Sequence, residues 1–551
     1  MKELIFGLIG GTALLMYGVD KMGEGLEKAS GNMMKKILSV LTGNVFSAFI
    51  VGIVLTVLVQ SSTAITVLTV GFVNAGLMKL PQAVGIIYGA NIGTTITAQL
   101  MAFSFKFKLT DIALPVLGIG FAISYFFKNK TIKNVGEAVM GFGMMFLGLK
   151  ILNQGVPFLQ NSETMKYFFE NYANIPVVGI LLGALATALV HSSSATVGLV
   201  MVLGQAGLID ITTAVCIMLG DNIGTCITAQ LASMTANIHA RRTAWAHTLY
   251  NLFGVIVTWI ILVPFVKLIE FATMYIQNTS NIEVQIANSH TLFNILSAIV
   301  FLPITKYYVK FLETFIRGRK NEDDTKSVYL DKLLIQTPIA AFKATVSEIT
   351  RGAEITKDMT MKVMKALYSS DEKNLKLAEK DEDTINHLQK DITQYMVDIQ
   401  KEPLSQEQSV MVPAMINSIN NIERIGDHLI DISGLVKTTI EHNYKFTTSA
   451  NEELKMLEAL VYDMFDNTIK TLKYYDLDLA AKVAELEDEV DSLSERMQSN
   501  HITRLEYGDC TIEAGVIFLD IVTHFERIAD HLYKISLLTT DGLQGIMKSV
   551  S

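Results

Sequence analysis

Long, nearly continuous apolar stretches fill the first 310 residues of the chain, and short polar segments separate them. Several approach the ~20 residues that a helix needs to cross a bilayer. The stretches lack the alternation of a membrane β-barrel, so the pattern predicts membrane helices. They cover approximately 4–19, 38–59, 64–78, 83–103, 112–127, 135–152, 175–190, 195–209, 213–235, 245–266 and 290–309.

From about residue 330 the apolar positions follow the period of amphipathic helices, without a strand signal. The charged segment 317–328 is predicted to be a linker. We therefore expect an all-α protein, with a membrane domain over 1–316 and a soluble domain over 329–551. Within the soluble domain, two helical bundles are predicted over about 330–442 and 450–541.

Charge separates the same two parts. Residues 1–310 contain 18 basic and 12 acidic side chains, which leaves 27 basic and 42 acidic ones for the rest. The net charge of −9 argues against a nucleic-acid-binding protein, which would present a basic face. Three cysteines do not make a disulfide framework. We interpret the apolar N-terminus as a retained helix rather than a signal peptide.

The membrane part contains an internal repeat. Residues 48–100 align without a gap with residues 179–231, and 24 of 53 positions are identical. The repeats are predicted to extend over about 1–127 and 135–266, with an additional helix over 290–309. A fainter match predicts a glycine stripe on one helix of each repeat, where backbones can approach closely. These glycines are Gly11, Gly18 and Gly25, and Gly141, Gly148 and Gly155.

Basic loops predict the topology, because they favour the cytoplasmic side. They lie at Lys28–Lys36, Lys128–Lys133, Arg241–Arg242 and Lys306–Lys320. This arrangement inverts the second repeat relative to the first and makes the soluble domain cytoplasmic. The duplicated segment of each repeat then crosses the membrane an odd number of times, either as a re-entrant hairpin plus one span or as three full spans.

Polar turns interrupt the apolar helices at matching places in the two repeats, which is typical of a transporter's midplane site. Hydroxyls, amides and half-helix N-termini suit an oxyanion, and neutral oxygens also suit Na⁺. The predicted anion-binding residues are Gln60, Ser61, Ser62, Thr63, His191, Ser192, Ser193 and Ser194. Helix–helix contact is the alternative role for such residues.

Fixed positive charge is almost absent around these turns, since residues 38–103 contain only Lys79 and residues 175–235 contain no lysine or arginine. A multiply charged anion would therefore need accompanying cations, which favours cation-coupled transport of phosphate or sulfate. Asp221 replaces Ala90 at equivalent positions and is a candidate Na⁺ ligand, with a structural hydrogen bond as the alternative. The full candidate set for Na⁺ is Ser61, Ser62, Asn91, Thr94, Thr95, Ser192, Ser193, Asp221, Asn222 and Thr225. Gln99 and Gln230 are expected to be structural.

The soluble part contains a second repeat, in which Ile422–Leu429 matches Phe525–Leu532. Each copy places two carboxylates four residues apart on one helix face. Upstream, Glu382–Asn386 resembles Glu487–Asp491. The duplicated acidic residues are Glu382, Glu423, Asp427, Glu487, Glu526 and Asp530. A solvated acidic face is the alternative to two equivalent cation sites.

These motifs resemble two families. The Gln-Ser-Ser-Thr-Ala and His-Ser-Ser-Ser-Ala segments, each followed by Gly-x-Asn-Ile-Gly-Thr, resemble the type II sodium–phosphate cotransporters. The Glu-Arg-Ile-Gly-Asp-His and Glu-Arg-Ile-Ala-Asp-His segments resemble PhoU, the phosphate-regulation protein. The resemblance implies Na⁺-driven symport of inorganic phosphate and divalent or ferric metal ions at the six carboxylates. One departure is His191, where the cotransporters usually have Gln.

The sequence thus predicts a multi-pass protein of the inner cell membrane that moves phosphate with Na⁺ by alternating access. Its expected partners are the lipid bilayer and a second copy or a phosphate-signalling protein, with no nucleic acid. The alternatives are a phosphate exporter, a transporter of another oxyanion, and a membrane phosphate sensor that does not transport. No nucleophile elbow, Walker loop or H-E-x-x-H motif is present, so we do not expect an enzyme.

Overall fold

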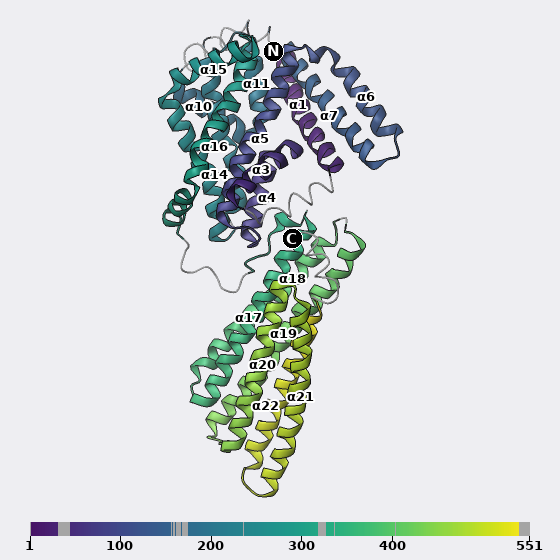
Figure 1. Ribbon diagram of the computed structural model, residues 1–551, viewed down its shortest axis with the longest axis vertical. Coiled ribbons are helices and arrows are strands. Elements are labelled where there is room, and N and C mark those ends of the chain that lie inside the picture. The colour runs from purple at the N-terminus through teal and green to yellow at the C-terminus, as the bar shows by residue number, and fades with distance from the viewer. Residues whose placement is uncertain are drawn as a thin grey trace. The chain divides into compact units, whose positions relative to one another are not determined.

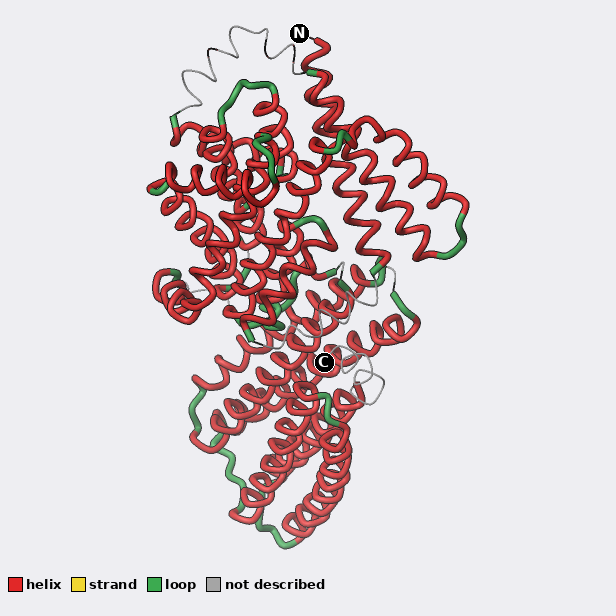
Figure 2. The backbone as a smooth tube through the Cα atoms, turned by 45° about the horizontal axis from the view of Figure 1, so that its top comes forward, coloured by secondary structure: helices red, strands yellow, loops and turns green. Residues whose placement is uncertain are grey.

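The computed structural model describes residues 2–30, 44–155, 157, 160, 167, 175–234, 236–317, 327–335, 337–402 and 404–538. Every regular element in these ranges is a helix, as predicted (Figure 2). The chain divides into two compact units, Met1–Val73 with Met78–Gly318, and Asn74–Leu77 with Arg319–Ser551. Most of the predicted linker 317–328 and part of the basic loop at Lys28–Lys36 lie outside the described residues.

The first unit contains the apolar helices (Figure 1). Among the described residues, four helical stretches are long and apolar enough to cross a membrane, or five if a pair bent by 89° counts as one span. The described helices are α1 (Lys2–Ala29), α3 (Val45–Val59), α4 (Ser62–Asn74), α5 (Leu80–Lys106), η2 (Leu109–Ile112), α6 (Ala113–Phe126), α7 (Lys130–Gln154), α10 (Pro176–Val190), α11 (Ser193–Gln205), α12 (Ile211–Gly224), α13 (Cys226–Ser233), α14 (Ile238–Ile260), α15 (Leu262–Gln277) and α16 (Ile282–Phe315).

Two predicted apolar stretches are each divided between two helices. The stretch 213–235 breaks at Thr225, between α12 and α13, and the stretch 245–266 breaks at Ile261, between α14 and α15. Pro264 explains the second break, since proline fits the first turn of a new helix but cannot continue an old one. Thr225 keeps helical backbone, so Ile211–Ser233 still counts as one candidate span, whereas the helix axis bends by 89° at Ile261.

The interruptions at the polar turns are confirmed. In both repeats a helix of 15 residues ends, and one of 13 residues begins three positions later. The residue at each break has left-handed backbone, with φ of 58° at Gln60 and 56° at His191. Each of these four helices is shorter than a membrane span.

The predicted glycine stripes on α1 and α7 face one another. A Cβ placed on Gly148 would lie 2.8 Å from the carbonyl oxygen of Gly11, and one on Gly18 would lie 2.8 Å from that of Gly141. No side chain fits between the helices at these points. The stripes therefore allow the backbones of α1 and α7 to touch.

The two repeats share a second close approach, of α3 against α5 and of α10 against α12. A Cβ on Gly52 would collide with the carbonyl of Ile86, and one on the equivalent Gly183 would collide with that of Ile217. The repeat seen in the sequence is therefore also a repeat of packing geometry.

The second helix of each interrupted pair packs against the other repeat. Val70 of α4 shares an apolar cluster with Ala229 of the second repeat. Its equivalent Met201, on α11, shares a cluster with Ala98 of the first repeat. This reciprocal exchange joins the two repeats into one unit.

In its described residues the second unit has six long helices that run alongside one another, preceded by a short 3-10 helix (Figure 1). They form two sets of three, and equivalent helices of the two sets meet, α17 with α20 and α19 with α22. This arrangement gives the unit an approximate two-fold symmetry. The helices are η4 (Lys332–Leu334), α17 (Pro338–Ser369), α18 (Lys373–Ile399), α19 (Gln406–Glu441), α20 (Thr448–Tyr474), α21 (Leu477–Glu506) and α22 (Ile512–Leu538).

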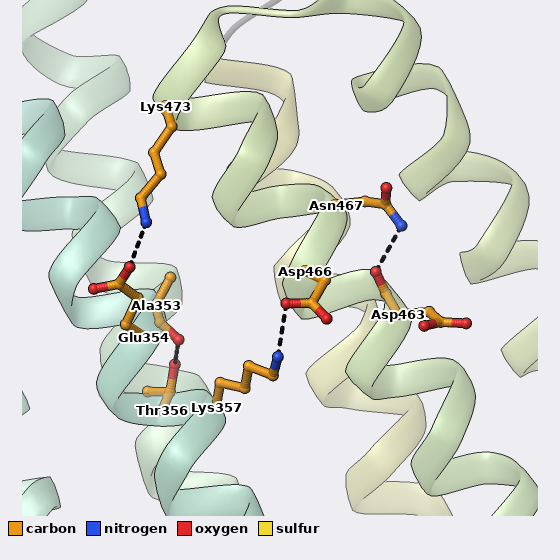
Figure 3. A network of polar contacts seen from close by, with 8 residues as sticks. All are labelled: Ala353, Glu354, Thr356, Lys357, Asp463, Asp466, Asn467 and Lys473. Atoms are coloured by element: carbon orange, nitrogen blue, oxygen red, sulfur yellow. Dashed lines mark hydrogen bonds and ion pairs between the residues drawn. The ribbon is translucent and has the colours of Figure 1, made fainter.

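Ion pairs and a buried core join these two sets. Lys357 of α17 lies 2.6 Å from Asp466 of α20, and Lys473 of α20 lies 2.6 Å from Glu354 of α17 (Figure 3). Such partly exposed pairs each contribute about 0–1 kcal/mol. Fully buried side chains such as Phe465 contribute more, about 1.5–3 kcal/mol each.

Candidate functional site

Each polar turn of the first unit ends in a serine that caps the following helix. The backbone N–H of Ala64 donates to Ser61 Oγ at 3.2 Å, and that of Ala195 donates to Ser192 Oγ at 3.3 Å. Ser62 and Ser193 are the first residues of α4 and α11. The free N–H groups of a first turn and the positive end of the helix dipole both attract an anion.

Gln60 and His191 precede these serines and make equivalent contacts. The Thr97 hydroxyl donates to Gln60 Oε1 at 2.7 Å, and His191 Nδ1 lies 3.2 Å from the hydroxyl of Thr228, the counterpart of Thr97. His191 thus occupies the structural position of a glutamine, although it is exposed whereas Gln60 is buried.

The remaining predicted anion-binding residues differ in exposure. Ser62 and Ser194 are buried, whereas Thr63 is half-buried. Within the described residues no hydrogen bond joins the Ser61–Ser62 turn to the Ser192–Ser193 turn. The structure thus gives each turn the same form, and the shared site remains a prediction.

Asp221 is fully buried between helices. Its Oδ1 accepts a hydrogen bond from the Thr187 hydroxyl at 2.7 Å, and Thr187 also lies 2.8 Å from the Thr196 hydroxyl. Its Oδ2 has no hydrogen-bond partner within the described part of the chain. A buried carboxylate oxygen without a partner is costly, and a bound cation would remove that cost.

The first repeat has no such carboxylate. Thr56 is the equivalent of Thr187, and its hydroxyl has no hydrogen-bond partner among the described residues, because Ala90 stands where Asp221 does. The two repeats are therefore not equivalent as cation sites.

The asparagines at equivalent positions connect the repeats to later helices. Asn91 donates to Asn251 Oδ1 of α14 at 3.2 Å. Asn294 of α16 donates to Asn222 Oδ1 at 3.4 Å, and Asn222 itself donates to the Met218 carbonyl at 2.9 Å. Both are buried, so helix contact is an observed role for each.

The candidate threonines use their hydrogens within their own helices. Thr94 donates to the carbonyl of Ala90 at 3.1 Å and Thr225 to that of Asn222 at 2.8 Å. Thr95 makes a similar bond. A hydroxyl that donates keeps lone pairs that a cation can use. Gln99 and Gln230 bind polar side chains of neighbouring helices, in keeping with a structural role.

Thr187, Asn251 and Asn294 are the polar residues that the sequence analysis did not single out. All three are fully buried in apolar helices, and each bonds to a candidate site residue. The sequence does indicate these three residues, because polar side chains inside membrane helices are functional candidates in general.

The second unit gathers its duplicated carboxylates into two groups. In the first, burial and the negative charges of Asp427 and Glu382 raise the pKa of Glu423. Asn386 donates to Glu382 at 2.5 Å. Mutual repulsion of this kind favours a cation between the carboxylates.

The second group contains a carboxylate that the prediction omitted. Burial and the charges of Asp491 and Asp530 raise the pKa of Glu487, and burial and Asp491 do the same to the pKa of Glu526. Asp491 stands where the first group has Asn386. The two predicted cation sites therefore differ by one charge, and metal binding at both stays a prediction. Both donor sets fit hard or borderline cations.

Comparison with known proteins extends this picture. A family model described as Na+/Pi-cotransporter matches residues 14–154 and 159–277, and a PhoU domain model matches residues 349–436 and 454–539. The chain is 30% identical over 316 residues to "Uncharacterized protein YqeW" of Bacillus subtilis, which covers 57% of this chain and 99% of that protein. The chain belongs to the Na⁺/Pi-cotransporter family.

Two further relatives carry functional names. The "Putative inorganic phosphate export protein YjbB" of Escherichia coli is 27% identical over 533 residues, which are 95% of this chain and 94% of that protein. The "Sodium-dependent phosphate transport protein 2A" of Rattus norvegicus is 33% identical over 106 residues, or 19% of this chain and 17% of that protein. The predicted family resemblance is confirmed, and phosphate is the transported substrate of the family.

Proposed function

We propose that this protein is a sodium-coupled phosphate transporter that works by alternating access. The observation that carries the proposal is the equivalent form of the two interrupted helices. In both repeats a serine caps a half-helix, and the N-terminus of a helix attracts an oxyanion. Equivalent half-helices in inverted repeats form the substrate site of many transporters.

The scarcity of fixed positive charge supports coupling to a cation. Lys79 is the one basic residue within 48–100 and 179–231. Phosphate bound there needs neutralising charge, which Na⁺ ions bound nearby would provide. The unpartnered oxygen of Asp221 makes the second repeat the stronger candidate for a Na⁺ ligand.

Export is the second candidate function. The name of the Escherichia coli relative favours it, and the alignment with that relative covers 95% of this chain and 94% of that protein. A coupled carrier is reversible, so the combined gradients of Na⁺ and phosphate set its direction. The same site therefore serves both uptake and export.

The soluble unit is proposed to regulate transport from the cytoplasm. Basic loops between the membrane helices favour this side of an inner membrane. The two carboxylate groups would hold divalent or ferric ions there, which would neutralise their repulsion. A phosphate sensor without transport is the competing proposal.

Uptake of radiolabelled phosphate into proteoliposomes tests the proposal. An inward Na⁺ gradient should accelerate uptake relative to a K⁺ gradient of equal size. Equal uptake under both gradients would contradict sodium coupling, and no uptake under either would favour the sensor. Sulfate added in excess should leave the uptake unchanged if phosphate is the substrate.

A further inference from the structure

A pair of histidines occupies the interface between α19 and α22, the central pair of helices in the soluble unit. His428 Nδ1 lies 3.1 Å from His524 Nδ1. Asp431, one turn after His428, places its Oδ2 3.9 Å from the same nitrogen of His524. A ligand atom from each of the three residues lies within 4.8 Å of the other two.

The approximate symmetry of the unit supplies an internal comparison. Across the 103-residue repeat, His428 corresponds to His531, His524 to Asn421 and Asp431 to Lys534. The rings of His428 and His531 stack, with centroids 5.6 Å apart and planes at 23°. The two places are therefore built alike but carry different side chains. We call His428, His524 and Asp431 the first place, and their counterparts His531, Asn421 and Lys534 the second place.

The second place contains an ordinary hydrogen bond. His531 Nδ1 lies 2.9 Å from the amide oxygen of Asn421, which accepts its hydrogen. Lys534 brings a positive charge near that ring and helps to lower the pKa of His531, after burial as the larger cause. This place offers one imidazole and a cation, and it has no donor set for a metal.

The first place replaces the amide with a second imidazole and the lysine with a carboxylate. Two imidazole nitrogens that face each other need either a shared proton or a metal ion between them. Zinc binds nitrogen at about 2.0–2.1 Å, so two such ligands in a tetrahedral site lie roughly 3.3–3.4 Å apart. The observed 3.1 Å is close to this spacing.

The surroundings also suit a metal. Asp431 is exposed and the two histidines are half-buried, so an ion could enter from solvent. The open side would leave one coordination position to water.

We propose that His428, Asp431 and His524 bind a divalent transition-metal ion of the zinc type, which links α19 to α22. Two nitrogens and one oxygen select such a metal, whereas the oxygen-only carboxylate groups suit harder ions. The donor set thus differs in chemistry from those groups, although His428 directly follows Asp427 and His524 lies two residues before Glu526. Its existence does not depend on transport. By bridging α19 and α22, the ion would fasten the two three-helix sets together.

Titration with Co²⁺ tests this proposal, because tetrahedral Co²⁺ absorbs visible light much more strongly than octahedral Co²⁺. The full-length protein is purified in detergent, stripped of metal and titrated while its absorbance is followed. We expect the tetrahedral band to saturate at one ion per chain and to disappear when Zn²⁺ is added. Absence of a tetrahedral band would overturn the proposal.

Variants separate this site from the carboxylate groups. Asp431→Asn and His524→Asn should each weaken Co²⁺ binding at least ~10-fold. Even the loss of a residue that only hydrogen-bonds to a metal ligand lowers metal affinity about 10–100-fold. His531→Asn is the matched control and should leave the band unchanged. A band that persists in His524→Asn would place the metal elsewhere and overturn the proposal. Asp431 is exposed, so its variant should fold normally.

A gain of binding gives an independent test. Asn421→His together with Lys534→Asp recreates the same three donors at the second place, and a second Co²⁺ ion per chain should then bind. Lys534→Asp alone is the control, because Lys534 also lies 3.7 Å from Asp530. A double variant that binds no more Co²⁺ than this control would contradict the proposed donor set.

Discussion

At the scale of single residues, the serines of the two turns provide the most specific prediction. Ser62→Ala and Ser193→Ala each remove a hydroxyl that is proposed to donate to phosphate. A hydrogen bond to a charged group contributes about 1.5–3 kcal/mol, so each variant should raise the KM for phosphate roughly tenfold or more. Initial uptake rates over a range of phosphate concentrations give this value.

Ser47→Ala is the control for the serine variants, because Ser47 lies at the start of α3 and donates to the Asn44 carbonyl at 2.8 Å. Its kinetics should match the wild type. Wild-type kinetics in both Ser62→Ala and Ser193→Ala would rule out their role in binding phosphate.

Asp221 and Thr187 yield a second prediction. Asp221→Asn removes the charge proposed to hold Na⁺, and Thr187→Val removes the hydrogen bond of 2.7 Å that orients this carboxylate. Both should raise the Na⁺ concentration required for half-maximal uptake. Thr56→Val is the matched control, since the equivalent threonine has no carboxylate beside it, and its Na⁺ dependence should be unchanged. Equal effects of Thr187→Val and Thr56→Val would sink the assignment of Asp221.

Sequence alone could predict those residues that repeat. Ser61 and Ser192 were found because two copies of one motif agree, and the structure gives both the same capping bond. The sequence does not indicate His524 as a ligand, because its partners His428 and Asp431 lie on another helix. Periodicity predicts which face of a helix a residue occupies, but not which helix lies opposite.

At the scale of helices, the glycine stripes predict where volume cannot be added. A methyl group on Gly18 would lie within 2.8 Å of the Gly141 carbonyl, and backbone cannot move aside as a side chain can. Overpacking of this kind costs about 1–3 kcal/mol. Gly18→Ala should therefore lower the melting temperature of the purified full-length protein.

Gly10→Ala is the control on the same helix, because nothing lies within 4 Å of a Cβ at Gly10. It should melt at the wild-type temperature or slightly above it, since alanine favours helix. If Gly18→Ala were as stable as Gly10→Ala, then α1 and α7 would not touch as described.

The helices themselves show where sequence reasoning succeeds and where it stops. Gln60 and His191 mark breaks that polar residues in apolar stretches reveal. The short interruption at Thr225 is not revealed in this way, because residues 222–231 differ from residues 91–100 of the unbroken α5 only at Cys226. Tertiary contacts decide such breaks, and a single sequence does not record them.

At the scale of the whole molecule, the carboxylate groups predict metal-dependent stability. Bound ions would neutralise Glu423, Glu487 and Glu526, whose pKa values are raised by burial and by neighbouring carboxylates. Removing the ions restores the repulsion, so chelation should lower the melting temperature of the full-length protein. Elemental analysis should find fewer ions in Asp427→Ala with Asp530→Ala. No metal in the wild type, and no effect of the chelator, would make these residues an ordinary acidic surface.

The central claim is that phosphate and sodium move together, and the flux of sodium tests it most directly. Proteoliposomes without any Na⁺ gradient are given an inward phosphate gradient, and the entry of radioactive sodium is measured. Coupling predicts that phosphate drives Na⁺ inward, and that Ser62→Ala combined with Ser193→Ala reduces this flux at the same phosphate concentration. Phosphate entry without any phosphate-driven entry of sodium would contradict the account.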